Sequence, residues 1–363
     1  MNRRNYFHLL LLAAAVILIQ LCASGLNKEF YLTQLTMSAY YSLVVLGLCL
    51  LMGCAGQASL GHGAFFAIGG YMSAVLTTHN LAVWQKAVWA GWLQRAGVLV
   101  LQDNLFDGTS QLVFTPWAAF LAAMVFTIVI AILVGYPSLR LKGHYLAMAT
   151  LGFSLIVYRL LLASPLTGSA DGINGVPPWP ILPGLTVSGE KPLRISNYYL
   201  SWLIAMMALV LLMNLVHSRV GRALRAIHDG ETAANAMGIN TGRFKLMAFV
   251  VSALLAAAAG SFLTHYNAGI GPSEASAMKS VRYVTLVAVG GMDNFWGSLL
   301  MSVLLNFLSL RGYFGTYDHA VFGIILILII SLMPDGPFKP LGNLIQRLST
   351  NRIAGGKEKH GSA

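Results

Sequence analysis

The side chains that could transfer protons, bind metals or activate nucleophiles are few in this sequence. It holds twelve Asp and Glu residues and nine His residues among 363 positions. The histidines do not show the HExxH spacing of a zinc enzyme. Cys22, Cys49 and Cys54 lie in apolar stretches and lack the CxxC spacing of metal ligands. We therefore expect no catalytic set and no metal site, and we interpret the cysteines as small apolar packing residues.

The elements that must position any functional group are strongly apolar. Hydrophobic residues make up 57% of the chain and charged residues 10%, with a mean hydropathy of +0.70, whereas soluble domains have about 25% charged residues. A helix needs roughly 20 apolar residues to cross a bilayer. The sequence thus predicts an all-α fold, a polytopic transmembrane helical bundle of about eight to ten spans. The candidate spans are 7–26, 36–55, 58–79, 116–135, 144–163, 198–217, 246–266, 281–292, 296–311 and 319–333.

The basic residues set the expected orientation. The net charge is +11, and most of the 23 Lys and Arg residues lie in alternate loops between the spans. This is the positive-inside pattern, so we expect both termini in the cytoplasm and no nucleic-acid partner. We interpret the first span as a retained helix and not as a cleaved secretory signal. Residues 1–340 then form one transmembrane domain, and 341–363 form a cytoplasmic tail.

Two outer loops are long. Residues 80–115 carry three tryptophans in WQKAVWAGWLQRAGV, which suggests a segment resting at the membrane interface. Residues 164–197 are rich in Gly and Pro. They form either a plain connector or a loop that meets an extracytoplasmic partner.

A source of energy for transport is not visible in the chain. Proton-driven carriers usually need a carboxylate within the membrane, and all twelve acidic residues fall in the predicted loops. Sodium coupling through backbone carbonyls stays open. The P-loop pattern GxxxxGK[ST] is missing, and AGGKEK in the tail has neither its first glycine nor its hydroxyl. If the chain moves a solute, we expect the energy source on another chain and no cofactor on this one.

One apolar stretch carries polar residues and glycines that a lipid-facing helix does not need. It reads GQASLGHGAFFAIGGYMSA, residues 56–74. Five glycines can break a helix, and a break is tolerated only where protein or a watery cavity receives the freed backbone groups. We predict a translocation pathway here, with close helix packing as the alternative. Its candidate residues are Gly56, Gln57, Ser59, Gly61, His62, Phe65 and Phe66. VAVGGMDNFWGS, residues 287–298, is a second Gly-interrupted segment, and such pairs point to a possible internal repeat.

The longest predicted inner loop, 218–245, has the composition of a docking element. Within it ETAANAM predicts a short helix, with Asp229 as its N-terminal cap and Gly238 ending it in a left-handed turn. Small residues would let another surface come close. From composition alone, a positive-inside loop that happens to be helical is an equal alternative.

Several motifs in order resemble one known family, the permease subunits of branched-chain amino acid ABC transporters, in particular the longer of the two paired permeases. The motifs are GQASLGHGAFFAIGGY at 56–71, LRLKGHYLAMATLGF at 139–153, LTGSADGING at 166–175, GRALRAIHDGETAANAMGIN at 221–240, VAVGGMDNFWG at 287–297 and PDG at 334–336. His144 departs from the family, which commonly has an acid there, and the 80–115 insertion matches no shared motif.

The resemblance implies an inner-membrane subunit that is not itself an enzyme. Its implied partners are a second permease subunit, two cytoplasmic ATPase subunits that bind ATP, a periplasmic substrate-binding protein, and membrane lipid around the permease. It also implies that the 221–240 stretch contacts the ATPase, which makes Arg222, Arg225, Asp229, Glu231 and Gly238 the coupling residues. A urea or short-amide permease of the same superfamily, or a stand-alone channel or secondary carrier, stays as an alternative.

Overall fold

The computed structural model describes residues 3–80, 91, 94–95, 97–103, 110–141 and 143–332. Its α-helices are α1 (Arg3–Gly25), α2 (Phe30–Cys49), α3 (His62–Thr78), α5 (Pro116–Ser138), α6 (His144–Ala163), α7 (Arg194–His217), α8 (Arg219–Asp229), α9 (Glu231–Ala236), α10 (Thr241–Asn267), α11 (Ala277–Gly290), α12 (Phe295–Leu310) and α13 (Asp318–Leu332). The strands are β1 (Leu99–Asp103), β2 (Ser110–Phe114), β3 (Ile173–Asn174), β4 (Trp179–Leu182), β5 (Leu185–Val187) and β6 (Gly269–Ile270).

The predicted helical bundle is confirmed, because each of the ten apolar segments forms a helix. Six helical segments of the described chain are long and apolar enough to cross a membrane, and the shorter α12 is also apolar. Several helices start before the predicted spans: α2 at Phe30, α7 at Arg194, α10 at Thr241 and α11 at Ala277. In α11, Lys279 and Ser280 interrupt the apolar pattern of the first turn, so this pattern placed the start of the helix too late.

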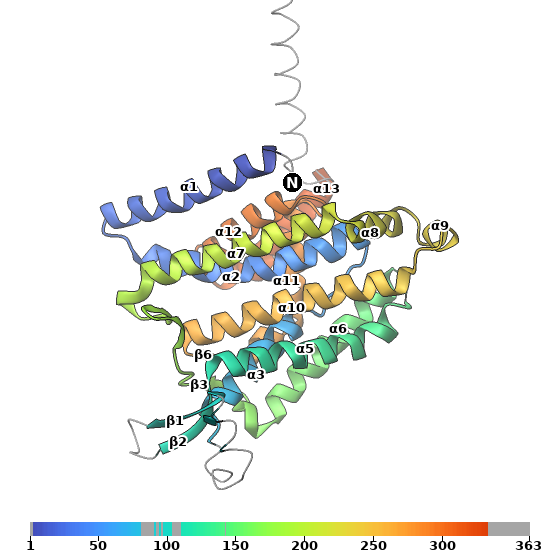
Figure 1. Cartoon of the computed structure of the whole chain (residues 1–363). Helices are drawn as coiled ribbons and strands as arrows, with labels where there is room; N and C mark the ends of the chain where they lie inside the picture. Colours follow the sequence, from blue (N-terminus) through green and yellow to red (C-terminus); the bar gives the residue numbers. More distant parts are fainter. Residues whose placement is uncertain are drawn as a thin grey trace, which may run out of the picture.

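α2 is the central helix of the bundle, and α1 and α5 lie at its periphery (Figure 1). In the apolar window of the α2 span 94% of residues are buried, against 17% in that of α1. The peripheral helices turn large apolar side chains outward at helical spacing, for example Leu203, Met207 and Leu211 along α7. Such exposed apolar stripes suit a lipid environment and not water. The helices therefore divide into a buried centre and a rim that can face lipid.

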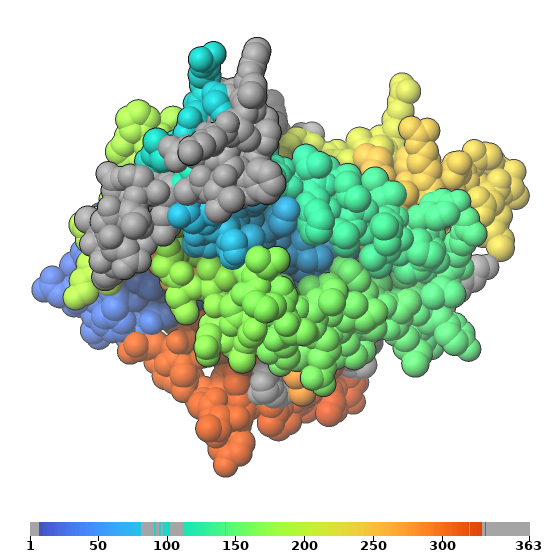
Figure 2. Space-filling model, turned by 90° about the horizontal axis from the view of Figure 1, so that it is seen from below, coloured from blue at the N-terminus to red at the C-terminus, as the bar shows by residue number. Residues whose placement is uncertain are grey.

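The strands lie at the end of the bundle opposite to α8 and α9 (Figure 1). β1 and β2 pair antiparallel within the 80–115 segment, whose three tryptophans lie outside the described residues. The 164–197 loop is ordered in short elements, since β3 pairs with β6 and β4 with β5. Trp179 anchors it by stacking on Phe262 of α10, with 4.8 Å between ring centroids. At the other end, α8 and α9 form a yellow projection at the edge of the molecule (Figure 2).

Glycines bring α3 and α10 into direct backbone contact. A Cβ atom added to Gly69 would overlap the backbone of Ala257, and one added to Gly260 would overlap the carbonyl oxygen of Phe66. The Ser261 hydroxyl donates a hydrogen bond of 2.9 Å to the Gly69 carbonyl across this contact. Close approach through small residues is a common way to pack membrane helices. Part of the glycine content of the 56–74 stretch therefore serves packing, the alternative weighed from the sequence.

We expect Gly69→Ala to lower the thermal unfolding midpoint of the purified protein in detergent. The new methyl group forces the two helices apart, and overpacking of this kind costs about 1–3 kcal/mol. The matched control is Gly152→Ala on α6, where an added Cβ meets no described atom within 4 Å. The control should unfold at or above the wild-type temperature. Equal midpoints for wild type and Gly69→Ala would contradict the close contact.

Candidate functional site

The predicted helix break is present and follows a distorted turn. α2 continues into a π-helical segment, Leu50–Cys54, the backbone is irregular from Gly56 to Gly61, and α3 then begins at His62. π-helical turns are rare and are often found at functional sites. The second interruption, between α11 and α12, packs directly on this turn. A Cβ added to Gly53 would overlap the Met292 carbonyl, which accepts a 3.0 Å hydrogen bond from the Cys49 thiol. The two Gly-interrupted segments are thus neighbours in space.

The 218–245 segment folds into two short helices that stand at the end of the bundle (Figure 1). α8 buries Gly221, Leu224 and Ile227 on one face and exposes Arg222 and Arg225. The predicted short helix is confirmed as α9. Gly238 follows it with a φ of +82°, as predicted, and the Ile239 amide donates to the Ala234 carbonyl at 3.0 Å. This is the usual way in which a left-handed glycine ends a helix.

The predicted capping role of Asp229 is wrong. Asp229 is the last residue of α8, and Gly230 takes the N-cap position of α9 with an extended backbone. Glu231 instead holds α9 in place through an ion pair with Lys245, with 2.6 Å between its Oε1 and the Lys245 Nζ. The Thr241 hydroxyl donates to the Asn235 side-chain oxygen at 3.1 Å. Residues at the start of α10 therefore fix the orientation of α9.

The helix break and the α8–α9 segment, which the sequence places far apart, meet in the structure. A Cβ added to Gly56 would lie 2.9 Å from the His228 Nδ1 atom of α8, and Gly56 has a φ of +66°. A cavity of about 390 Å³ adjoins this contact. Gln57 from the break, His144 from α6 and the Glu231–Lys245 pair line it. Gln57 is 4% exposed, and neither polar atom of its side-chain amide has a partner in the described part of the chain.

The other predicted pathway residues lie between helices. The His62 Nε2 atom is 2.6 Å from the Ser252 hydroxyl of α10. Ser59 is buried, and an added Cβ on Gly61 would lie 3.2 Å from the Thr150 carbonyl of α6. Phe65 packs edge-on against Phe249 at 5.5 Å. Gly56 and Gln57 thus face a cavity, whereas His62 and Phe65 fill space between α3, α6 and α10.

Phe66 belongs to a different environment, near the strand end of the bundle. It stacks on Tyr41 of α2 with 5.6 Å between ring centroids. It also lines a cavity of about 80 Å³ together with Leu263, Ile270 and Glu274. Phe66 therefore lies next to a group of charged residues that were not predicted as site residues from the sequence.

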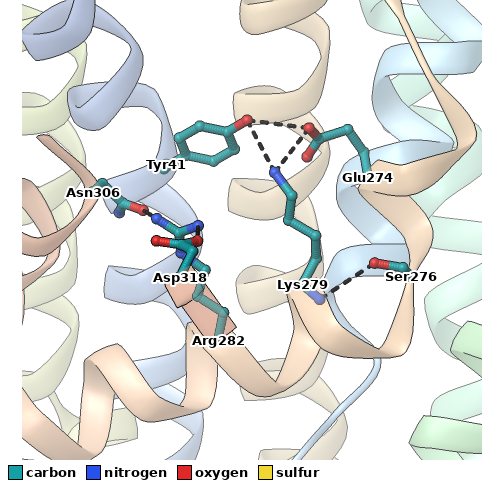
Figure 3. Close-up of polar contacts among 7 residues, drawn as sticks. All are labelled: Tyr41, Glu274, Ser276, Lys279, Arg282, Asn306 and Asp318. Carbon is teal, nitrogen blue, oxygen red and sulfur yellow. Dashed lines mark hydrogen bonds and ion pairs between the residues drawn. The ribbon is translucent and has the colours of Figure 1, made fainter. Parts of the chain in front are cut away.

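These charged residues form two ion pairs beside α11 (Figure 3). Lys279 Nζ lies 3.0 Å from Glu274 Oε1, and Arg282 Nη1 lies 3.0 Å from Asp318 Oδ2. Lys279 lies before the predicted span 281–292, and both acidic residues lie in predicted loops. The signal that could have placed the basic pair was the spacing of Lys279 and Arg282, three apart and followed by apolar residues, which extends the helix backward. Glu274 is five residues from Lys279, whereas only tertiary contact brings Asp318 to Arg282.

The described residues hold no group of three or more His, Cys, Asp or Glu side chains arranged to bind a metal ion.

Comparison with known proteins places the helix break and the α8–α9 segment in a known family. The family described as the permease component of branched-chain amino acid transport systems matches residues 30–330. The chain belongs to this family. The match runs from the start of α2 almost to the end of α13, and so includes both interruptions and the α8–α9 segment.

Individual members of the family are similar over most of the chain. The high-affinity branched-chain amino acid transport system permease protein LivM of Salmonella typhimurium is 29% identical over 323 residues, which cover 83% of this chain and 68% of LivM. The corresponding protein LivH of Escherichia coli is 25% identical over 311 residues, covering 83% of this chain and 92% of LivH. BraD of Pseudomonas aeruginosa is 25% identical over 323 residues, covering 84% of this chain and 95% of BraD. No solved structure matches the chain.

Proposed function

We propose that this permease is the membrane-spanning subunit of an ATP-binding-cassette importer for branched-chain or related amino acids. The matched relatives are named as permeases of high-affinity branched-chain amino acid transport systems, and this supports the substrate class. In this proposal a second permease completes the membrane unit, two ATPase subunits bind ATP, and a periplasmic protein delivers the amino acid. The chain is then a transport subunit and not an enzyme, and it has no cofactor of its own. It spans the inner membrane with both termini in the cytoplasm.

The observation that carries the proposal is the contact between α8 and the helix break. α8 and α9 project from the bundle, and Met237 beside α9 is 83% exposed. The small residues of α9 let another surface approach this exposed side chain. A partner that moves α8 presses His228 against Gly56 and so acts on the break between α2 and α3. Binding energy from ATP on the partner subunits can reach the bundle by this contact.

In the proposed pathway the amino acid passes beside the broken segment. The cavity next to Gln57 has room for a small solute, and its unpartnered amide offers a donor and an acceptor. Ser59, Gly61 and His62 belong to the adjoining turn, and the proposal has Phe65 and Phe66 close the route with apolar rings when α3 moves relative to α6 and α10. Selectivity comes mainly from the binding protein, so the route needs only a few polar contacts.

The first test is uptake by the assembled transporter. The tagged chain is expressed with the ATPase, second permease and binding protein encoded beside its gene, and the purified complex is placed in liposomes. We expect the ATPase to co-purify and labelled leucine to accumulate only with ATP and the binding protein. Labelled urea is the control solute and should not accumulate. Accumulation of leucine by the chain alone, or of urea in preference to leucine, would contradict the proposal.

The second test addresses coupling through α9. Valine at position 238 would place a β-branched residue in a left-handed turn, at a cost on the order of 1–2 kcal/mol. We expect Gly238→Val to reduce ATPase co-purification or stimulated hydrolysis, because α9 no longer ends in its native turn. Gly238→Asn is the matched control, since Asn tolerates this conformation, and should behave like wild type. Unchanged hydrolysis and uptake in Gly238→Val would contradict the proposed docking of the ATPase on α9.

A further inference from the structure

An ammonium group already occupies a built site near the strand end of the bundle (Figure 3). The Lys279 ammonium lies 3.0 Å from Glu274 Oε1 and 3.5 Å from the Tyr41 hydroxyl, which itself lies 3.2 Å from the same carboxylate oxygen. The ammonium is also 5.0 Å from the centroid of the Tyr41 ring. A carboxylate, a hydroxyl and an aromatic ring are the groups that proteins use to bind amines.

This site has more hydrogen-bonding capacity than the protein uses. Glu274 Oε2 and the hydroxyls of Tyr71 and Tyr283 are buried, and none of the three has a hydrogen-bond partner in the described structure. The Tyr283 ring centroid lies 6.3 Å from that of Tyr41, and Tyr71 packs in one cluster with Ile270 and Ala275, the residue next to Glu274. Buried polar groups are nearly always paired, so three unpaired oxygens around one carboxylate need an explanation. A polar ligand that the structure does not contain would satisfy them.

The cavity beside Glu274 has a mixed lining. Phe66, Leu263 and Ile270 line it together with Thr264, Asn267 and Glu274, and its volume of about 80 Å³ is small. A carboxylate, two polar side chains and three apolar side chains around one small cavity suit a small solute with both a charged end and a hydrocarbon part. A branched-chain amino acid has this form.

The neighbouring ion pair serves as a comparison within the same helix. Arg282 contacts Asp318 of α13 and donates to the Asn306 side-chain oxygen of α12 at 3.0 Å. Its guanidinium carbon also lies 4.4 Å from the centroid of the Phe322 ring. These contacts tie α11 to α12 and α13, which is a structural role.

We propose that Glu274, Lys279 and Tyr41 form a recognition site for the α-amino and α-carboxylate groups of the transported amino acid. This inference rests on the proposed function. In the empty protein the Lys279 ammonium holds the place of the substrate's ammonium. The arriving substrate donates from its ammonium to Glu274 and Tyr41, and the released Lys279 binds the substrate carboxylate together with the free hydroxyls of Tyr71 and Tyr283.

The exchange keeps both partly buried charges paired. One zwitterion inserts between one carboxylate and one ammonium, so the net charge of the site does not change. Leaving one of these charges without a partner would be unfavourable. The site therefore favours a solute with both charges over an amine or an acid alone.

The experiment removes the free hydroxyls from the complete transporter in liposomes. Tyr71→Phe and Tyr283→Phe delete only an unpaired oxygen, so both variants should fold and assemble at least as well as wild type. We expect labelled leucine uptake to fall by roughly tenfold, as for loss of a hydrogen bond to a charged group. Tyr40→Phe is the matched control. Its hydroxyl is also buried without a described partner, but its ring stacks on Phe262, away from Glu274, and uptake should stay at the wild-type rate.

A charge exchange separates recognition from structure. Glu274→Lys combined with Lys279→Glu keeps an ion pair but exchanges the positions of its two charges relative to the cavity. We expect this double variant to lose leucine uptake. Restored uptake in this double variant, or wild-type uptake in both tyrosine variants, would overturn the site. Absence of leucine uptake by the wild-type complex would instead overturn the proposed function. Asp318→Asn should lower thermal stability without a specific loss of uptake per assembled complex.

Discussion

The backbone contact between α3 and α10 is the constraint on which the other features of this permease depend. Gly69 meets Ala257 and Gly260 meets Phe66 so closely that no side chain fits between them. This contact fixes the position of α3 along α10. It therefore places the break that precedes α3 beside α8 at one end, and Phe66 beside Glu274 toward the other.

The two ends of the bundle have different chemistry. At the α8–α9 end, the broken backbone, the π-helical turn and the second interruption between α11 and α12 gather around glycines. Irregular backbone of this kind can change conformation more readily than a regular helix. Toward the strands, hydrogen bonds of Tyr41 connect the Lys279–Glu274 pair to α2, and the Arg282–Asp318 pair joins α11 to α13. The molecule thus combines a deformable end, where force from a partner can enter, with a charged region, where a zwitterion can be recognised.

The fold could be predicted from the sequence to the extent that local patterns determine it. Long apolar segments located ten helices of the bundle, and the conformational freedom of Gly238 located the end of α9. Local patterns failed where two residues compete for one role, as when Gly230 and not Asp229 caps α9. They also missed the short strands in the 80–115 and 164–197 loops, and the pairing of Ile173 with Ile270 joins segments that are distant in the sequence. The number of membrane crossings and the internal repeat stay predictions.

The candidate sites were less predictable for the same reason. The glycine-rich break and the α8–α9 segment were each selected from sequence, but only the fold shows that His228 faces Gly56. Glu274 is five residues from Lys279 in the sequence, but the partners Tyr41 and Asp318 come from α2 and α13, and no local pattern brings these together. The roles of the pathway and coupling residues therefore stay predictions that depend on this contact between distant segments.

The contact between Gly56 and His228 is tested most directly by a double-mutant cycle on the assembled transporter. Leucine uptake per ATP hydrolysed is measured for wild type, Gly56→Ala, His228→Ala and the double variant. The backbone strain of alanine at position 56 is present with and without His228, so it cancels in the cycle. Transmission through this contact predicts that Gly56→Ala uncouples hydrolysis from uptake and that removing the His228 ring restores much of the loss. Purely additive effects of the two substitutions would contradict the account.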